Sequence, residues 1–405
     1  MLKMLVLEAW VVAWAEGRRE QALAAAGAAL ATAVASGLGY GRSPAGERLF
    51  DPVEADHFLD WSAMVGSDRT WLDSLEATNS ALVDEFRDRR RSVQAPAGGG
   101  ARFAVSLRRT FDLRRLPAVA RARLRMPLPL KCEYHPEVSV TALLPAGPGV
   151  DATLTDGRLE LRLDRPADPI VTIGADIELM AQLPGARPVG GQLPAAERQV
   201  YLRTSDGLIQ VTPAIRVLAE RLAGSAPPDV AVSAIAAHMS ARLRFDFVRY
   251  DEIDRKAPGD WVIENGYHDC QLCAALLVAL CRARGIPARM VAGNYLYRLS
   301  PTSHNWVEIW LDDRGWAPLD ILHRERHRPE AGQGVPWWSQ FAERGDYRLV
   351  SQRLPLSFTG PMSIRFPPVW QMLHAPTLDG VAIRYVDVSD GALVYQDDIA
   401  VKRLA

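Results

Sequence analysis

Three side chains that together can carry out cysteine-dependent acyl transfer follow one another along the chain. Cys270 opens the run CQLC, His304 opens the run HNWVE, and Asp320 ends the run GWAPLD. A thiol supplies a nucleophile, an imidazole exchanges protons near neutral pH, and a carboxylate orients the imidazole ring. Each residue alone has a commoner structural explanation, but their shared order makes Cys270, His304 and Asp320 the candidate catalytic residues.

The element that presents the cysteine is a predicted helix over residues 270–284. The segment is apolar on nearly every face, which is typical of a helix buried in a core. Asp269 or His268 is the expected N-cap. Gly285 and Pro287 mark the end, because glycine suits the position after a helix and proline cannot continue one.

A place in the first turn of this helix has two chemical consequences for Cys270. The partial positive charge of a helix N-terminus lowers the pKa of a nearby thiol, so we expect a lowered pKa for Cys270. The N–H groups of the first turn lack partners within the helix, so they can receive a developing oxyanion.

His304 and Asp320 are expected on two successive antiparallel strands. A tight turn at residues 313–314 would place Asp320 opposite Val307. Direct opposition of His304 and Asp320 requires a wider turn centred on Asp312, or a bulge. The strand pattern alone therefore leaves the contact between imidazole and carboxylate open.

The run CQLC also admits a redox pair or a zinc pair formed by Cys270 and Cys273. Cys281 cannot join them on one ion, because it lies about 16 Å farther along a helix. His323 and His327 have the spacing of metal ligands, but a solvated Arg-rich segment explains them better. We expect no metal, and we expect Cys273 and Cys281 in the core.

The four cysteines are Cys132, Cys270, Cys273 and Cys281, and their spacing is not that of a disulfide framework, which favours a reducing compartment.

The composition is that of a soluble globular protein with more than one domain. The chain has 405 residues, of which 48% are hydrophobic and 23% charged. The net charge of −1 gives no reason to expect nucleic acid or a membrane as a partner. The apolar start resembles a signal peptide, but Glu8 interrupts it, and no stretch reaches the roughly 20 apolar residues of a membrane span. We therefore expect a cytoplasmic protein, and the excess of arginine over lysine is typical of a GC-rich bacterium.

Changes in pattern divide the chain into four expected segments. They are a helical N-terminal extension over 1–95, a β-sandwich-like domain over 101–203, a core with the candidate residues over 205–350, and a C-terminal β-rich segment over 351–405 that can belong to the core. Within the second segment, Asp156–Gly157 predicts a hairpin turn. Within the third, the pattern predicts helices over 213–224 and 228–241 and a strand over 243–248.

Residues 268–320 resemble the transglutaminase-like superfamily of papain-type cysteine enzymes. The resemblance rests on motifs in a fixed order, namely DCQ followed by AALL, then CRARGIPARMVAG, then HNWVE, then GW and Asp320. It implies an α+β fold, in which a helix carrying Cys270 packs on an antiparallel sheet. It also implies Cys270 as nucleophile, His304 as general base and acid, and Asp320 as the residue that orients His304. The glycine that many relatives carry close before the cysteine is replaced by GYHD at 266–269, so the second oxyanion donor is unassigned.

These features predict acyl transfer through a thioester formed on Cys270. The expected acyl donor is a peptide, an amide or a carrier-bound thioester, and the acceptor is water or an amine. Water would make the protein a cysteine protease or amidase, whereas an amine would make it a transglutaminase or an amide synthase acting on carrier-bound or small substrates. A non-catalytic interaction scaffold is a further alternative, which the intact triad disfavours. We expect no cofactor, and the oligomeric state stays open.

Overall fold

A computed structural model of the chain describes residues 100–112, 121–144, 151–155, 157–164, 170–182, 191–246, 256–296, 303–322, 347–353 and 394–404. Shorter described pieces are 34–35, 41–42, 48–49, 248, 253–254, 375–378 and 381–383. The expected helical extension over 1–95 therefore lies almost wholly outside the described residues. His323 and His327 lie outside them as well.

The chain forms two compact units, which are described separately. In the unit made of residues 1–93, 246–251 and 368–389, the described elements include two short antiparallel pairs. These pairs are β1 (Gly41–Arg42) with β2 (Arg48–Leu49), and β17 (Ala375–Leu378) with β18 (Val381–Ile383). The other unit contains all three candidate catalytic residues.

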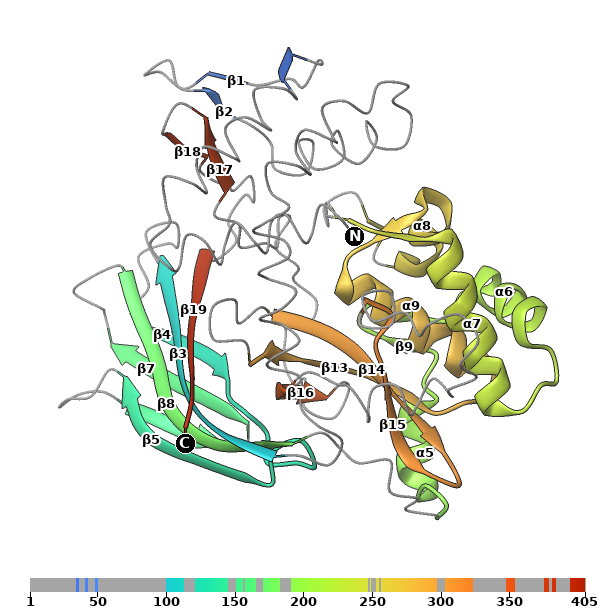
Figure 1. Ribbon diagram of the computed structural model, residues 1–405, viewed down its shortest axis with the longest axis horizontal. Coiled ribbons are helices and arrows are strands. Elements are labelled where there is room, and N and C mark those ends of the chain that lie inside the picture. The colour runs from blue at the N-terminus through green and yellow to red at the C-terminus, as the bar shows by residue number, and fades with distance from the viewer. Residues whose placement is uncertain are drawn as a thin grey trace. The chain divides into compact units, whose positions relative to one another are not determined.

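Two antiparallel sheets occupy the region where a β-sandwich was expected (Figure 1). One sheet has the strand order β19-β3-β8-β5, and the other has the order β4-β7-β6. Their bounds are β3 (Gly100–Asp112), β4 (Arg121–Pro127), β5 (Glu137–Leu144), β6 (Asp151–Thr155), β7 (Arg158–Asp164), β8 (Ile170–Gln182) and β19 (Val394–Arg403). The predicted hairpin is confirmed, because Thr155 pairs with Arg158 and Gly157 has a φ of 67°.

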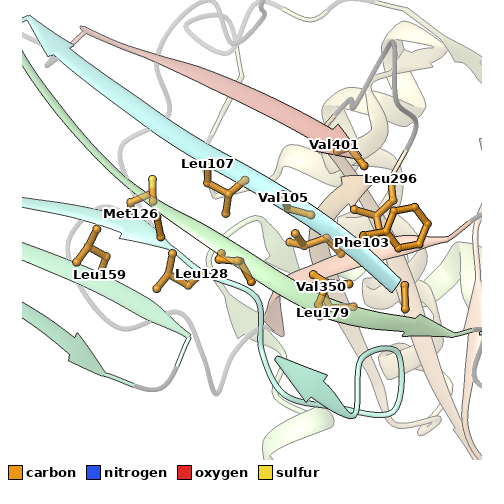
Figure 2. Packing of buried hydrophobic residues seen from close by; sticks show 14 of the residues in the cluster. Phe103, Val105, Leu107, Met126, Leu128, Leu159, Leu179, Leu296, Val350 and Val401 are labelled. Carbon is orange, nitrogen blue, oxygen red and sulfur yellow. The ribbon is translucent and has the colours of Figure 1, made fainter. Parts of the chain in front are cut away.

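Both sheets bury side chains in one hydrophobic cluster (Figure 2). Phe103 and Leu107 lie on alternate positions of β3, and Met126 of β4 belongs to the same cluster. Alternation of this kind places every second side chain of a strand in the core. Leu296 and Val350 also belong to the cluster. The candidate catalytic segment and the two sheets are therefore packed around shared apolar residues.

A second four-stranded sheet carries His304 and ends one residue before Asp320. Its strand order is β15-β14-β13-β16, and all its pairs are antiparallel. The bounds are β13 (Ala288–Tyr295), β14 (Ser303–Leu311), β15 (Gly315–Leu319) and β16 (Arg348–Arg353). Gly293 is required where β13 meets β16, since an added Cβ would stand 1.7 Å from the Leu349 carbonyl oxygen.

The helices gather around the element that carries Cys270. That helix, α9 (Cys270–Ala283), packs against β14 and against α6, α7 and α8. The neighbours are α6 (Pro213–Ala223), α7 (Pro228–Arg242) and α8 (Pro258–Asn265). Prolines at the first turns of α6 and α7 begin these helices as predicted. Among the described helices, none is long and apolar enough to cross a membrane.

Short elements complete this unit, and one of them corrects a prediction. They are α5 (Ala195–Tyr201), β9 (Ser205–Asp206), β10 (Ile209–Gln210), β11 (Arg244–Phe245) and β12 (Tyr267–His268). The strand expected over 243–248 is wrong in length, because only β11 forms there. Its partner β12 offers two residues in a parallel pairing before α9 begins, so the ladder ends at once.

Candidate active site

Cys270 is the first residue of α9, and the predicted N-cap fixes it there. The Asp269 side chain accepts a hydrogen bond from the Leu272 N–H at 2.8 Å, and the Asp269 carbonyl accepts one from the Cys273 N–H at 2.9 Å. Asp269 itself is extended, with φ −89° and ψ −178°, as an N-cap residue should be. At the other end, Gly285 follows the helix with a φ of 72°. Both predicted ends of this helix are therefore confirmed.

The register between β14 and β15 brings Asp320 to His304. Leu311 pairs with Gly315 and Val307 pairs with Leu319, so the turn has three residues rather than two. Neither the tight turn at residues 313–314 nor the wider turn centred on Asp312 is formed, and Asp320 stands opposite neither Val307 nor His304. Asp320 comes one residue after the last pair and approaches His304 diagonally, which is within the reach of long side chains across a ladder. His304 Nε2 lies 2.9 Å from Asp320 Oδ2.

Two further side chains share the Asp320 carboxylate, and the sequence did not predict them. Arg348 Nη2 lies 2.7 Å from Asp320 Oδ2, and the Tyr295 hydroxyl donates to the same oxygen at 3.3 Å. The Arg348 guanidinium also lies over two rings, 4.8 Å from the Tyr295 centroid and 4.9 Å from that of Trp306. Arg348 is 1% exposed. A charged residue directly before the apolar pair Leu349 and Val350 was the one signal that could have indicated it.

The His304 ring is held by aromatic contacts as well as by Asp320. It stacks on Tyr295 with centroids 4.8 Å apart and planes 20° apart, and on Trp306 at 6.3 Å and 17°. Because its Nε2 faces Asp320, Nδ1 is the ring nitrogen that proton exchange with a nucleophile would use. The carboxylate and the stacked rings thus fix both the tautomer and the orientation of His304.

Cys270 lines one pocket together with His304 and Asp320. The thiol is in contact with Asn305: the side-chain Nδ2 lies 3.7 Å from Sγ, and the Asn305 backbone also forms a hydrogen bond with the thiol. The lining residues are Phe245, His268, Cys270, Cys273, Ala274, Leu277, His304, Asn305, Trp306, Val307, Leu319, Asp320, Ile321 and Leu322. The structure therefore places all three predicted residues in one pocket, with two of them directly hydrogen-bonded.

The electrostatic environment of Cys270 differs from the expectation. Burial, followed by the neighbouring Asp269 carboxylate, raises the pKa of the Cys270 thiol to about 12. The Asn305 contact acts in the other direction but does not outweigh these two effects. A helix N-terminus contributes at most about 2 kcal/mol even in a favourable site. The expected lowered pKa is thus wrong for the resting structure, in which the thiol is neutral.

His268 is a buried imidazole in the same pocket. It is 2% exposed, and burial lowers its pKa to about 4. Its Nδ1 lies 3.2 Å from the Asp269 carbonyl oxygen, so Nδ1 carries the ring proton. Among the described residues, Nε2 has no hydrogen-bond partner. His268 is therefore a neutral ring with an acceptor nitrogen beside the candidate nucleophile, and it is not the N-cap.

The two other cysteines of α9 lie in the core of the protein. Cys273 and Cys281 are both buried in α9, as predicted, and all four cysteines are free thiols. Burial raises the pKa of Cys281 to about 12. Cys270 and Cys273 do not form a disulfide in this structure.

Solved structures that align with the chain come from several organisms. A candidate cysteine protease from Cytophaga hutchinsonii aligns with a TM-score of 0.44 and 15% identity, over 76% of this chain and 92% of that chain. The periplasmic domain of TgpA from Pseudomonas aeruginosa aligns with a TM-score of 0.30 and 17% identity, over 64% and 93%. Red sea bream transglutaminase aligns with a TM-score of 0.27 and 14% identity, over 64% and 56%.

The sequence comparison agrees with the motifs that surround the pocket. No curated protein sequence matches the chain. The family model of the transglutaminase-like superfamily matches residues 216–321, which run from α6 to just beyond Asp320. Cys270, His304 and Asp320 all lie within the matched segment, whereas Arg348 lies outside it. Residues 216–321 are therefore a transglutaminase-like superfamily domain.

Proposed function

We propose that the protein catalyses acyl transfer through a thioester on Cys270. The observation that carries the proposal is the hydrogen-bonded pair of His304 and Asp320, which lines one pocket with a cysteine at the start of a buried helix. A nucleophile, a base and a residue that orients the base are the parts that this chemistry needs.

In the first half-reaction, Cys270 Sγ attacks the carbonyl carbon of the donor while its proton passes to His304 Nδ1. The transfer accompanies the attack, because the raised pKa of Cys270 keeps the resting thiol neutral. The carbonyl oxygen becomes an oxyanion, which the Cys270 N–H at the start of α9 stabilises. When the adduct collapses, the carbonyl forms again, the bond to the leaving group breaks, and His304 returns the proton to the leaving group.

In the second half-reaction, water or an amine attacks the thioester carbonyl, and His304 removes a proton from the attacking atom. Collapse breaks the bond between carbon and Sγ, and the proton returns to Cys270. Asp320 stabilises the imidazolium that exists between these steps. Water as acceptor gives hydrolysis, as in a cysteine protease or amidase. An amine as acceptor gives a new amide, as in a transglutaminase or an amide synthase.

The proposal is tested with p-nitrophenyl acetate, an activated ester that acylates thiols directly. We expect the wild-type protein to gain one acetyl group, located on the peptide that contains Cys270, and the Cys270→Ala variant to gain none there. Cys281→Ala is the matched control, because it removes a buried thiol of the same helix that does not line the pocket, and this variant should acetylate normally. Equal release of p-nitrophenol by wild type and Cys270→Ala would rule the proposal out.

The same assay separates hydrolysis from amide formation. Acetylated protein is transferred into buffer with or without a simple primary amine, and the small products are identified by mass spectrometry. Acetate alone in the presence of excess amine supports hydrolysis, whereas formation of the acetamide supports amine transfer.

A further inference from the structure

The Asn305 side chain is in hydrogen-bond contact with the candidate nucleophile. Its Nδ2 lies 3.7 Å from Cys270 Sγ, and both residues line the pocket. The Asn305 backbone pairs with Ala292 in the β13–β14 ladder, so the amide stands on a rigid element. A donor held this way meets a developing charge without reorganising, and preorganised donors are the most effective kind in acyl transfer.

The position of Asn305 suits the oxyanion as well as the thiol. In the tetrahedral adduct, the oxyanion is two bonds away from Sγ. A donor that already contacts Sγ can therefore reach that oxygen with a small rotation of its side chain. The resting contact on a neutral thiol is a weak one, since sulfur is a poor acceptor. An oxyanion would form a much stronger bond with the same N–H group.

The Cys270 N–H at the start of α9 is a backbone donor that can act together with this amide. Asp269 accepts hydrogen bonds from the N–H groups of Leu272 and Cys273, farther along the first turn of α9. His268 cannot be the second donor, because its Nδ1–H faces the Asp269 carbonyl and its Nε2 is an acceptor. Asn305 is a pocket residue whose side-chain N–H already contacts Sγ.

We propose that the Asn305 side-chain amide is the second oxyanion donor, acting with the Cys270 N–H. The inference rests on the proposed acyl transfer and assigns a catalytic residue within it. In the adduct, the carbonyl π electrons move onto oxygen as Sγ bonds to carbon. Asn305 Nδ2–H donates to that oxygen until the leaving group departs and the carbonyl forms again.

Two reactions of the same thiol test the assignment. Acetylation by p-nitrophenyl acetate passes through an oxyanion, whereas alkylation by iodoacetamide displaces iodide without forming one. Because both need the Cys270 thiol, the ratio of their rates at one pH cancels any effect of Asn305 on the thiol itself. We expect Asn305→Ala to lower this ratio about 10²- to 10³-fold, the usual loss for one oxyanion donor. Asn305→Asp, which places a carboxylate there, should lower the ratio at least as much.

The control is Asn265→Ala, which removes an exposed amide that donates to the Trp261 carbonyl at 2.8 Å. It should leave the ratio within about 3-fold of wild type. Circular dichroism checks folding, and Asn305→Ser replaces Asn305→Ala if the alanine variant does not fold. An unchanged ratio in the Asn305 variants, whether both rates fall together or neither falls, would overturn the assignment. Failure of the proposed function itself is distinct, because wild type and Cys270→Ala would then release p-nitrophenol equally.

Discussion

Two buried histidines in this protein have opposite surroundings. His304 is 4% exposed and places Nε2 against the Asp320 carboxylate at 2.9 Å. His135 is fully buried, and its ring faces backbone groups and a thiol: Nδ1 donates to the Leu130 carbonyl and lies 3.6 Å from Cys132 Sγ, and the Val350 N–H donates to Nε2 at 2.7 Å. Burial is therefore common to both rings, and the partner groups distinguish them.

The partners decide what each ring can do. A second proton on His135 would have to point at the Val350 N–H, and burial lowers the pKa of His135 to about 4. His135 thus works as a neutral link between the backbone of Leu130 and strand β16. His304 faces a carboxylate that stabilises an imidazolium, so its charge can change during a reaction. A buried histidine indicates catalysis only when its partner can accept an N–H from both the neutral ring and the imidazolium.

The largest effect that tests this comparison is on activity. His304→Gln should lower the rate of Cys270 acetylation by about 10²- to 10⁴-fold, because the general base is lost. His135→Gln should leave that rate within about 3-fold, since glutamine keeps one donor and one acceptor for the same backbone groups. The measurement is p-nitrophenol release, with the folded fraction of each variant checked by circular dichroism. Equal losses in the two variants would break the comparison.

Removal of the second partner of Asp320 should mainly affect stability. Arg348→Met leaves the buried Asp320 carboxylate without its cation, and breaking one side of a buried ion pair costs about 3–5 kcal/mol. Urea unfolding measures the loss. The double variant Arg348→Met with Asp320→Asn removes both charges and should recover part of it. If the double variant loses as much unfolding free energy as the two single variants together, the two charges do not interact.

The pH dependence of stability should reveal the neutral histidine. In the unfolded chain, His135 gains a proton below its ordinary pKa of 6.5. In the folded protein, the pKa of His135 is about 4, so the ring stays neutral until the pH is lower. The contribution of neutral His135 to the free energy of unfolding is therefore complete above pH 6.5, declines as the pH falls, and is lost by about pH 4. Between pH 7 and pH 5, wild type should lose about 2 kcal/mol more unfolding free energy than His135→Gln. Parallel urea titrations of the two proteins at both pH values would show whether this excess exists.

The smallest effect should come from an ion pair at the surface. Arg102 and Glu137 approach to 2.7 Å, as closely as Arg348 and Asp320, but their side chains are 52% and 60% exposed. Arg102→Ala should change the unfolding free energy by less than about 1 kcal/mol, and 1 M salt should remove most of that change. A loss as large as that of Arg348→Met would show that distance matters more than burial.

The sequence predicted what depends on neighbouring residues. The limits of α9 follow from Asp269 at its start and from Gly285 at its end, because capping is decided within a few residues. The roles suggested for Cys270, His304 and Asp320 came from motif order and family resemblance. The structure adds that these residues line one pocket.

Interactions between distant residues were harder to predict. The diagonal approach of Asp320 depends on a three-residue turn that no strand pattern specifies. Arg348 comes from a strand beyond the family segment, so no local motif connects it to Asp320. The pKa of Cys270 was predicted in the wrong direction, because the helix N-terminus was considered without the burial that surrounds it.

The pairing of β19 with β3 has a consequence for biosynthesis. Val394 pairs with Asp112, and the ladder continues to the pair of Arg403 with Phe103. Strand β3 is therefore synthesised long before its partner β19. Until residues 394–403 leave the ribosome, β3 presents an unpaired edge, and such edges recruit strands from other chains. Slow translation of the intervening segment, or premature termination before β19, should therefore promote aggregation of nascent chains.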